Sequence, residues 1–582
     1  MQKRDLDSFL LPFGYGDGGG GPCRDHIEYI RREKDLQGMP RVSMTSPQAF
    51  FEALQAKGGP SHTWSGELYF SAHRGTYTVQ AQIKKNNRRT ELLLRQAELW
   101  SALAGRLIAK RPVHDAFSRL WKQLLLHQFH DILPGSSIAR VYEEANAAHE
   151  RMQSECADLM RESMRMLTPG EGVTCFNSLS WPVTQVIALD NRFSNGAITP
   201  DGESVPVLNG YARVTVPSMG WVSLVPGDVP PPAAVCSVRL TKNGFLLEND
   251  VITVRIDRMG EMTGYERKDG TLLFEGRPMN RLEMYKDVPR TFDAWDIDSV
   301  YIKDPIPLTG KVTMRITEAS GLRAEIEVCR EIGSSSVTQR IRIEAGSEQV
   351  FFDTRVSWHE LHRLLKVRFE SDIHAVNAIH EIQFGYVERP AHRSSSYDQT
   401  RFEVCNHHYT ALCDRGRGFA LLNDCKYGVS AQEGAVCLTL LRAGASPEMR
   451  TDQGEHHFTY AFTAWTGDFT ASPVVTEGYQ LNQPILLSEG NAPTYSAFAI
   501  DQPNIILETV KEAEDESGDL ILRLYESKGA TTRCRLGLGF SAERVQQCDM
   551  LENPESDLAL EENVTALSFR PFEIITLRVS GE

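Results

Sequence analysis

The sequence predicts a multidomain protein in which a short α/β segment is followed by a helical segment and then by a large all-β part. Three observations support this prediction. A chain of 582 residues is too long for one hydrophobic core. Apolar residues recur at helical spacing between about residues 87 and 168. From residue 169 to the end, short runs rich in Val, Ile, Thr and Leu alternate with Gly, Pro, Asn and Asp.

The first segment, residues 1–86, mixes helical and strand-like patterns. Ser46-Pro47 is a favourable helix start, and residues 50–54 continue it with an apolar pattern. Residues 66–70 predict a strand. This alternation favours an α/β arrangement, but the segment is too short to be a whole α/β domain.

The second segment, residues 87–168, predicts a three-helix antiparallel bundle, because three apolar stripes are separated by breaks at Arg111-Pro112 and Pro134-Gly135. The stripes consist of Leu93, Ala97, Trp100 and Ala104, then Phe117, Leu120 and Leu124, and then Ala145, Ala148, Met152, Cys156 and Leu159. The Met and Cys side chains of the third stripe are interpreted as core residues.

The third segment, residues 169–582, predicts several packed β-sandwiches. Strand-like runs include residues 251–256, 364–369 and 573–577. The Pro-rich stretch 225–232 predicts a linker, and we expect subdivisions near residues 240 and 485.

Composition excludes some functions. The net charge of −15 is unfavourable for binding nucleic acid. No apolar run is long enough for a membrane span, and the first residues lack the apolar core of a signal peptide. Eleven dispersed cysteines without a CxxC pair indicate reduced thiols. We therefore expect a cytoplasmic protein that binds neither nucleic acid nor membranes.

The most informative motif is residues 124–137, which predicts an apolar helix ending in His130-Asp131 and stopped by Pro134-Gly135. A helix end fixes the backbone and opens onto a surface, so it is a good place for a metal ligand. From the residues alone, an ordinary hydrogen-bonded histidine is the more common explanation.

A second motif, residues 14–22, contains six glycines, of which five are nearly contiguous between residues 16 and 21 and are costly to order. The motif lacks the Gly-Lys-Ser/Thr of a phosphate-binding loop and the spacing of a dinucleotide-binding turn. Two interpretations stay open: a flexible loop, or a loop whose backbone passes close to a ligand. In the second case, Asp17 is its ionisable group.

Two further stretches have side chains suited to a sugar. Residues 73–81 combine His, Arg, Tyr and Gln after the predicted strand, and residues 291–298 place Trp295 between acidic residues. Such polar groups hydrogen-bond to hydroxyls, while aromatic rings stack on the apolar faces of sugars. The alternatives are an exposed loop for the first stretch and a core tryptophan for the second.

Together these motifs resemble glycoside hydrolase family 38, the retaining alpha-mannosidases. The resemblance rests on Gln128-Phe129-His130-Asp131 followed by Pro-Gly-Ser, and it extends from about residue 10 to the C-terminus through segments in one order. These segments are residues 14–22, 73–78, 293–296, 384–390, 422–428, 452–458 and 570–573. The resemblance implies that residues 1–86 are a remnant of the catalytic α/β barrel, residues 87–168 the middle domain, and residues 169–582 the C-terminal β-sandwich domains.

The resemblance also implies site roles and a cofactor. His130 is the expected ligand of one divalent cation, expected to be zinc, and Asp17 is a candidate general acid/base. Some relatives carry a second carboxylate in that loop, where this chain has Gly18. The expected substrates are alpha-mannoside oligosaccharides, whose binding residues are His73, Arg74, Tyr77, Asp131, Trp295 and Asp296.

One family feature does not occur in this sequence. The resemblance implies a His-x-Asp segment followed by Ala-Trp, and then a nucleophilic Asp; the chain has no His-x-Asp, and His114-Asp115 is a poor substitute. We therefore expect the C-terminal two-thirds of an alpha-mannosidase without its nucleophile, inactive alone. Uncovered apolar faces of residues 1–86 predict association with an N-terminal partner polypeptide or a homo-oligomer.

Two other functions compete with this one. The alternative from another class is a non-catalytic carbohydrate-binding or scaffold fragment. A lyase or isomerase on a similar β-sandwich is disfavoured by the helix-end His130-Asp131 and the Gly-rich loop, which are specific to the mannosidase arrangement.

Overall fold

The computed structural model describes residues 6–16, 19–59, 61–110 and 113–581. It divides into two compact units, the N-terminal unit (Met1–Tyr69) and the large unit (Phe70–Glu582), which are described separately. The domain boundaries predicted near residues 86, 168, 240 and 485 stay predictions.

The N-terminal unit contains two helices, α1 (Arg24–Arg32) and α2 (Pro47–Ala56). Helix α2 starts as its sequence predicts, since Ser46 Oγ accepts a hydrogen bond of 3.1 Å from Ala49 N and Pro47 is the first helical residue. The strand predicted at residues 66–70 is wrong, because these residues pair with no neighbouring strand. A strand needs a hydrogen-bonded partner, and sequence pattern alone does not supply one.

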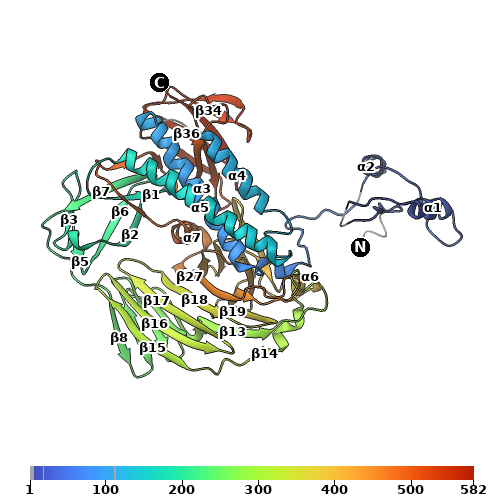
Figure 1. The fold of residues 1–582 in the computed structure, drawn as a ribbon, viewed down its shortest axis with the longest axis horizontal. Helices are drawn as coiled ribbons and strands as arrows, with labels where there is room; N and C mark the ends of the chain where they lie inside the picture. Colours follow the sequence, from blue (N-terminus) through green and yellow to red (C-terminus); the bar gives the residue numbers. More distant parts are fainter. Residues whose placement is uncertain (1–5, 17–18, 60, 111–112, 582) are drawn as a thin grey trace. The chain divides into compact units, whose positions relative to one another are not determined.

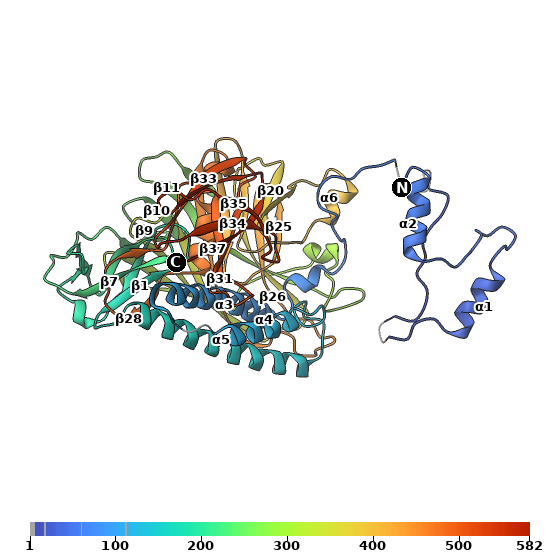
Figure 2. The same ribbon diagram turned by 90° about the horizontal axis from the view of Figure 1, so that it is seen from above.

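The large unit begins with the short helix η2 (Arg74–Tyr77) and three longer helices, α3 (Ala81–Ile108), α4 (His114–His127) and α5 (Ala139–Leu167). The three long helices run side by side along one side of the large unit (Figure 2). The first turn of α3 is capped from far away in sequence, since both carboxylate oxygens of Asp452 accept backbone hydrogen bonds, from Gln80 N at 2.9 Å and Ala81 N at 2.7 Å.

The remainder of the large unit is mostly antiparallel β-structure (Figure 1). A six-stranded sheet has the order β28-β1-β7-β3-β4, with β29 also paired to β7; these are β1 (Val173–Asn177), β3 (Ala197–Ile198), β4 (Ser204–Val205), β7 (Gly220–Pro226), β28 (Leu486–Glu489) and β29 (Tyr495–Ser496). Three strands that lie between β1 and β7 in the sequence form a separate sheet with the order β2-β6-β5. They are β2 (Val183–Ala188), β5 (Val207–Leu208) and β6 (Tyr211–Val216). Residues 227–236 contain no strand, whereas Val225 and Pro226 of the predicted linker 225–232 belong to β7, so the linker stays a prediction.

The central β-region consists of three sheets. The five-stranded sheet β12-β11-β10-β9-β8 contains β8 (Ser237–Thr241), β9 (Gly244–Glu248), β10 (Ile252–Asp257), β11 (Met262–Arg267) and β12 (Leu273–Met279). A six-stranded sheet, here called the β19 sheet, has the order β14-β13-β19-β26-β25-β22 and contains β13 (Arg281–Lys286), β14 (Pro305–Ile306), β19 (Arg363–Glu370), β22 (Val404–Cys405), β25 (Gly428–Gln432) and β26 (Ala435–Arg442). The nine-stranded sheet β15-β16-β17-β18-β27-β24-β23-β20-β21 contains β15 (Val312–Ala319), β16 (Arg323–Ile332), β17 (Ser335–Glu344), β18 (Val350–Trp358), β20 (Asn377–Ile382), β21 (Gly385–Pro390), β23 (Tyr409–Cys413), β24 (Arg417–Asn423) and β27 (Gly454–Thr466).

The C-terminal β-region has two sheets. The three-stranded sheet β30-β33-β36 contains β30 (Phe498–Ile500), β33 (Thr532–Leu538) and β36 (Val564–Phe569). The five-stranded sheet β31-β32-β37-β34-β35 contains β31 (Ile505–Glu512), β32 (Leu520–Glu526), β34 (Arg544–Cys548), β35 (Pro554–Leu558) and β37 (Ile574–Ser580). Short helices lie between strands: η3 (Asn191–Phe193), η4 (Ser299–Lys303), α6 (Ser396–Thr400), η5 (Phe469–Ala471) and α7 (Val474–Asn482).

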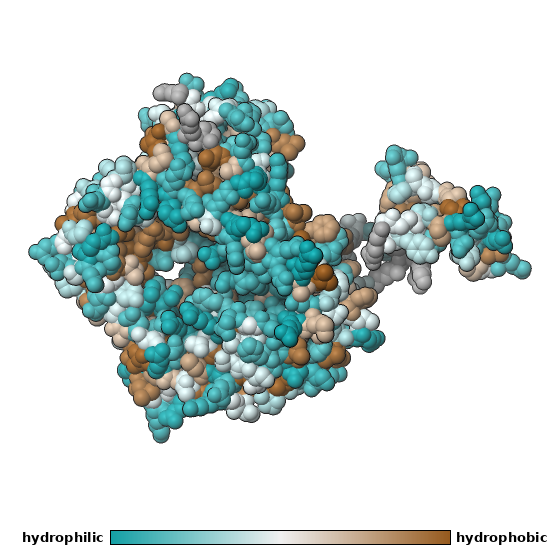
Figure 3. All heavy atoms as spheres, in the orientation of Figure 1, coloured by the Kyte–Doolittle hydropathy of each residue, from teal (hydrophilic) through white to brown (hydrophobic). Residues whose placement is uncertain are grey.

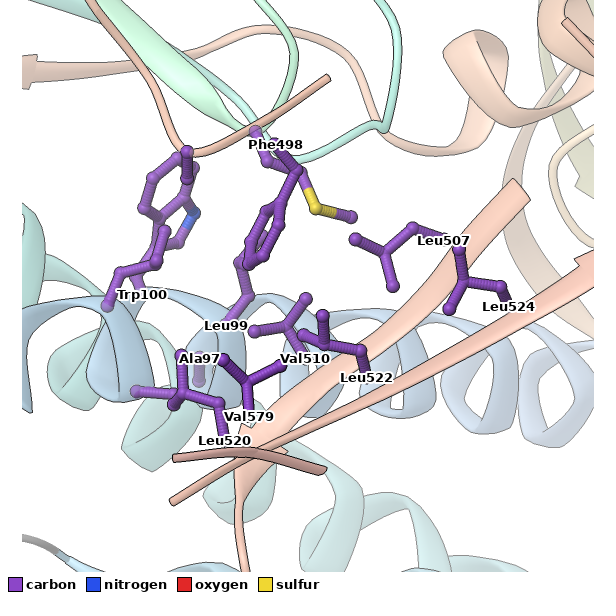
Figure 4. Close-up of a cluster of buried hydrophobic side chains, with 14 of the residues drawn as sticks. Ala97, Leu99, Trp100, Phe498, Leu507, Val510, Leu520, Leu522, Leu524 and Val579 are labelled. Atoms are coloured by element: carbon purple, nitrogen blue, oxygen red, sulfur yellow. The ribbon is translucent and has the colours of Figure 1, made fainter. Parts of the chain in front are cut away.

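The helices share most of their core with the C-terminal strands. Most of their buried apolar side chains belong to one cluster with side chains of β31, β32 and β37, while Ile83 of α3 and Tyr142 and Ala145 of α5 form a small separate cluster. In Figure 4, Ala97 and Leu99 of α3 lie beside Val510, Leu520, Leu522 and Val579 of these strands. The predicted stripes are confirmed at Ala97, Trp100, Ala104, Phe117, Leu120, Leu124, Ala145, Met152 and Cys156, all of which are buried. An independent three-helix bundle stays a prediction.

Candidate functional site

The turn between α4 and α5, residues 128–135, is the centre of the predicted site. Helix α4 ends at His127, three residues before His130. The turn closes at Gly135, whose φ of +90° suits glycine. A Cβ at this position would lie 2.6 Å from the Val79 carbonyl oxygen, so the backbones of residues 79 and 135 approach closely only because Gly135 has no side chain.

Buried polar groups hold this turn in place. The Lys84 ammonium donates to the carbonyls of Leu133 at 3.0 Å and Pro134 at 3.3 Å, and also to the Val79 carbonyl. Burial lowers the pKa of Lys84 to about 7. On the other side, the Tyr142 hydroxyl donates to the Asp131 carbonyl oxygen at 3.3 Å. These contacts fix the backbone that carries residues 130 and 131.

The His130 and Asp131 side chains themselves face solvent. They are 78% and 49% exposed, and His130 Nε2 lies 3.5 Å from Asp131 Oδ2. The Phe129 ring packs on the imidazole, with centroids 4.3 Å apart. An exposed imidazole beside a carboxylate is available to a metal ion, but two ligands do not make a stable site. Across the described part of the chain, no group of three or more His, Cys, Asp or Glu side chains is arranged to hold a metal. The described residues therefore do not form a complete metal centre.

A cavity of about 520 Å³, here called the tyrosine cavity, adjoins this turn. It connects the turn with η2 of the helical part and with β-rich segments more than 250 residues later in the chain. Its lining residues are Thr76, Tyr77, Lys84, Asn87, Arg88, Glu91, Leu92, Gln128, Leu133, Pro134, Glu381, Ile382, Gln383, Phe384, Cys405, His407, His408, Tyr427, Tyr479, Glu508 and Tyr525. Carboxylates, imidazoles and aromatic rings in one cavity are the groups that bind sugars.

The ionisable groups of the tyrosine cavity have different environments. Burial raises the pKa of Glu91, which favours its neutral form. Burial also opposes ionisation of Glu381, but the neighbouring His408 imidazole lowers the pKa of Glu381 overall. Burial lowers the pKa of His407 to about 4, so this ring is neutral at pH 7. The cavity thus offers an anionic acceptor at Glu381 and a carboxyl group at Glu91 that is easier to protonate.

Arg88 in the cavity wall is used for structure. Its guanidinium donates to the Tyr427 hydroxyl at 3.0 Å, to Asn423 Oδ1 at 3.0 Å and to the His407 carbonyl oxygen at 3.0 Å. It also lies over the Tyr427 ring, 4.3 Å from the centroid. Arg88 therefore ties α3 to the segments that carry His407 and Tyr427.

In the predicted sugar-binding stretch 73–81, some side chains lie at the surface and others in the interior. Tyr77 lines the tyrosine cavity. His73 is exposed and has a φ of +62°. Arg74 is buried, where it donates to the Thr400 carbonyl oxygen at 2.9 Å and lies 4.5 Å from the centroid of the Phe402 ring.

The structure brings the two predicted sugar-binding stretches together. Arg74 Nη1 lies 3.7 Å from Asp296 Oδ1, and Gly75 N donates to the Trp295 carbonyl oxygen at 2.8 Å. Buried Arg442 fixes the same stretch by donating to the carbonyl oxygens of Ala294 and Asp296. Trp295 itself is half-buried. Their predicted sugar contacts stay predictions.

Sequence reasoning missed several cavity residues. Glu91, Glu381, His407, His408 and Tyr479 were assigned no role, because helix and strand patterns place them on unrelated elements. Two of the later family segments do contribute to the cavity, 384–390 through Phe384 and 422–428 through Tyr427. Asp17, the candidate acid/base, lies outside the described residues.

Two further observations concern membrane spans and the state of the cysteines. Among the described helices, none is both long enough and apolar enough to cross a membrane. All eleven cysteines are free thiols.

Models of four protein-family segments match this chain in order. They are the glycosyl hydrolases family 38 N-terminal domain at residues 1–67, the alpha mannosidase middle domain at 71–167, the family 38 C-terminal domain at 247–450 and the family 38 C-terminal beta sandwich domain at 504–577. Together with the observed elements, these matches define a multidomain, mostly β protein with a helical middle segment. The chain belongs to glycoside hydrolase family 38.

Similar sequences are named alpha-mannosidases. The chain is 36% identical to alpha-mannosidase 2C1 of Homo sapiens, over 97% of this chain and 55% of that protein. It is 31% identical to alpha-mannosidase G of Dictyostelium discoideum, over 99% of this chain and 58% of that protein. The chain therefore spans somewhat more than half the length of these relatives.

A solved structure shows the same fold. The crystal structure of an alpha-mannosidase from Enterococcus faecalis V583 superposes with a TM-score of 0.76 at 17% identity, covering 96% of this chain and 75% of that chain. The multidomain, mostly β architecture with helices is thus that of a family 38 alpha-mannosidase structure. The barrel remnant predicted for residues 1–86 stays a prediction.

Proposed function

We propose that this chain is part of a retaining alpha-mannosidase, which hydrolyses terminal alpha-mannosyl residues of oligosaccharides. The observation that carries the proposal is the succession of four family 38 segments in one chain. The geometry around residue 130 supports it, because a rigid turn presents an exposed His130-Asp131 pair next to a cavity lined by carboxylates and tyrosines.

In this proposal, the residues of the tyrosine cavity bind and orient the sugar. Ionised Glu381 accepts hydrogen bonds from hydroxyl groups, and Tyr77 and Tyr427 offer rings and hydroxyls. The raised pKa makes Glu91 easier to protonate, and a protonated carboxyl group can donate a hydrogen bond where an ionised carboxylate cannot. Arg88 keeps the two sides of the cavity at a fixed separation.

The proposed cleavage needs groups that the described residues do not assemble. A retaining glycosidase places two carboxyl groups about 5 Å apart across the scissile bond. We propose that the nucleophile and the His-x-Asp ligands come from residues outside this sequence, and that His130 is this chain's ligand to a divalent ion, proposed to be zinc. Such an ion would help to hold sugar hydroxyls. With eleven free thiols, a cytoplasmic location is part of the proposal.

The experiment is a complementation assay with an aryl alpha-mannoside and zinc. The 582-residue chain alone is expected to show no turnover. Mixed with the part of the human relative to which it does not align, it is expected to become active. His130→Ala should abolish this activity and weaken zinc binding by the mixture. His374→Ala is the matched control, because His374 is also an exposed histidine.

Each part of the proposal has an outcome that contradicts it. Turnover by the purified chain alone would show that the sequence contains a nucleophile. Full activity of the His130→Ala mixture would remove His130 from the metal site.

A non-catalytic carbohydrate-binding fragment is the second candidate. It is favoured by the lack of a three-ligand metal cluster among the residues that the structure describes. Binding of mannose oligosaccharides by the chain, with an inactive mixture, would support this second function.

A further inference from the structure

A second cavity, of about 450 Å³, lies on one face of the β19 sheet. It shares no lining residue with the tyrosine cavity, and we call it the basic cavity. Strands β13, β19, β25 and β26 contribute Glu283, Tyr285, Lys366, Arg368, Ser430, Gln432, Ala435 and Cys437; η4 and the segment around α6 contribute Ser299, Val300, Tyr301, Ile302, Lys303, Arg393, Gln399 and Phe402.

The strand register places polar side chains on this face. Glu283 of β13 is directly opposite Lys366 of β19, and Arg368 of β19 is opposite Cys437 of β26. The alternate residues Met284, next to Glu283 on β13, and Val367, between Lys366 and Arg368 on β19, are buried. Because side chains alternate between the two faces of a strand, one face of this sheet is core and the other carries charges.

The cavity floor contains a built charge pair. Lys366 is 1% exposed, and its ammonium pairs with Glu403, which is 0% exposed. The Tyr301 hydroxyl lies 3.4 Å from the same ammonium. Burial opposes the charge on Lys366, but Glu403 raises its pKa overall. The Lys366–Glu403 pair therefore fixes polar groups at the cavity floor without adding net charge to it.

The lining is unusually basic for this chain. Lys303, Lys366, Arg368 and Arg393 line the cavity with a single carboxylate, Glu283, whereas the whole chain carries a net charge of −15. Glu403 offsets Lys366, and Glu370 accepts from Arg368 Nε at 3.3 Å. Exposed Lys303 and Arg393 therefore leave a positive excess toward solvent.

The remaining lining groups suit hydroxyls. Glu283 accepts a hydrogen bond of 2.8 Å from the Tyr285 hydroxyl. Gln399 and Gln432 offer amide donors and acceptors, and Phe402 adds an aromatic surface. Since ligand cavities are typically about 300–1,000 Å³, the volume of 450 Å³ suits a compact ligand.

We propose that the basic cavity binds a hexose that carries a phosphate group. The phosphate contacts Lys303, Arg393 and Arg368, and the sugar hydroxyls contact Glu283 and the glutamines. This ligand site is separate from the tyrosine cavity and goes beyond the proposed hydrolysis.

Isothermal titration calorimetry of the full chain tests this site with three probes: mannose 6-phosphate, mannose and inorganic phosphate. Mannose 6-phosphate is expected to bind at least about tenfold more tightly than either other probe, since it uses both the charges and the hydroxyl partners. Lys303→Ala/Arg393→Ala should weaken its binding by at least about tenfold. Arg140→Ala/Arg570→Ala, which removes two exposed arginines elsewhere, should leave it unchanged.

Glu283→Gln separates the two halves of the ligand. This substitution should weaken the binding of mannose 6-phosphate but not the binding of inorganic phosphate. The proposal is overturned if none of the probes binds, or if the Lys303→Ala/Arg393→Ala variant, shown to be folded by its thermal unfolding, binds mannose 6-phosphate as tightly as the wild type. Because the readout is binding to the chain alone, the result is independent of whether the chain takes part in hydrolysis.

Discussion

At the scale of single residues, the chain buries ionisable groups where helices meet. His149 of α5 is fully buried, and its Nδ1 lies 2.9 Å from the Thr90 hydroxyl of α3. The ring of His127 is 5.0 Å away, centroid to centroid. Burial, followed by the charge of His127, lowers the pKa of His149 to about 4. His149 is therefore neutral at pH 7 and resists protonation.

The lowered pKa of His149 predicts that the free energy of unfolding depends on pH. The folded pKa of His149 is below the unfolded value of 6.5, so its contribution is present above pH 6.5 and is lost as the pH falls toward 4. Between pH 7 and 5, the free energy of unfolding of the wild type should fall by about 2 kcal/mol more than that of His149→Gln. Urea unfolding followed by helical circular dichroism measures this difference.

The control is His374→Gln, since His374 is exposed. That variant should show the same pH dependence as the wild type. If His149→Gln also matched the wild type, His149 would not be responsible for the loss.

At the scale of elements, the α4–α5 turn is shaped by contacts with a residue just before α3 and a residue in the first turn of α3. Gly135 approaches Val79, and Lys84 binds the carbonyls of Leu133 and Pro134. The turn thus depends on segments about 50 residues earlier. This explains how two exposed side chains, His130 and Asp131, stand on a defined backbone.

Gly135→Ala tests the close approach. Any Cβ at a φ of +90° is strained, and here it would also meet the Val79 carbonyl oxygen at 2.6 Å. Gly202→Ala is a matched control, because its φ is +88° but a Cβ there meets nothing within 4 Å. We expect Gly202→Ala to cost about 1 kcal/mol and Gly135→Ala about 3 kcal/mol or more. Equal costs, measured by urea unfolding, would show that the turn tolerates a methyl group.

At the scale of the whole molecule, the two units differ in how they treat apolar surface. The large unit buries extensive clusters, and its face in Figure 3 is mostly hydrophilic with apolar groups in small patches. In contrast, none of the described residues of the N-terminal unit is buried. Large apolar side chains such as Phe9, Leu11 and Leu68 are 69%, 83% and 82% exposed. Such surface favours association.

We therefore expect the chain to self-associate through its N-terminal unit. Its mass by light scattering should rise with concentration, and Phe9→Ser/Leu11→Ser/Leu68→Ser should reduce this rise. The control Leu240→Ser/Met449→Ser/Leu551→Ser changes side chains that are 71%, 78% and 82% exposed in the large unit, and it should leave the rise unchanged. A wild-type chain that stays monomeric at all concentrations would contradict the prediction.

Sequence patterns were most reliable where a structure depends on nearby residues. The start of α2 follows from Ser46-Pro47, and the buried faces of the long helices follow from their apolar spacing. Strand β19 formed where the run 364–369 predicted it. The strand predicted at residues 66–70 does not form, because a strand depends on a pairing partner that its own residues do not specify.

By itself, the sequence determined the family, through short motifs in a fixed order, and the local elements, through capping and periodicity. Only the tertiary structure decided which distant residues meet: Arg74 with Asp296, Asp452 with the start of α3, and the walls of both cavities. The physical reason is range. Capping and apolar spacing act over a few residues, whereas a cavity is formed by side chains that pack together from separate elements.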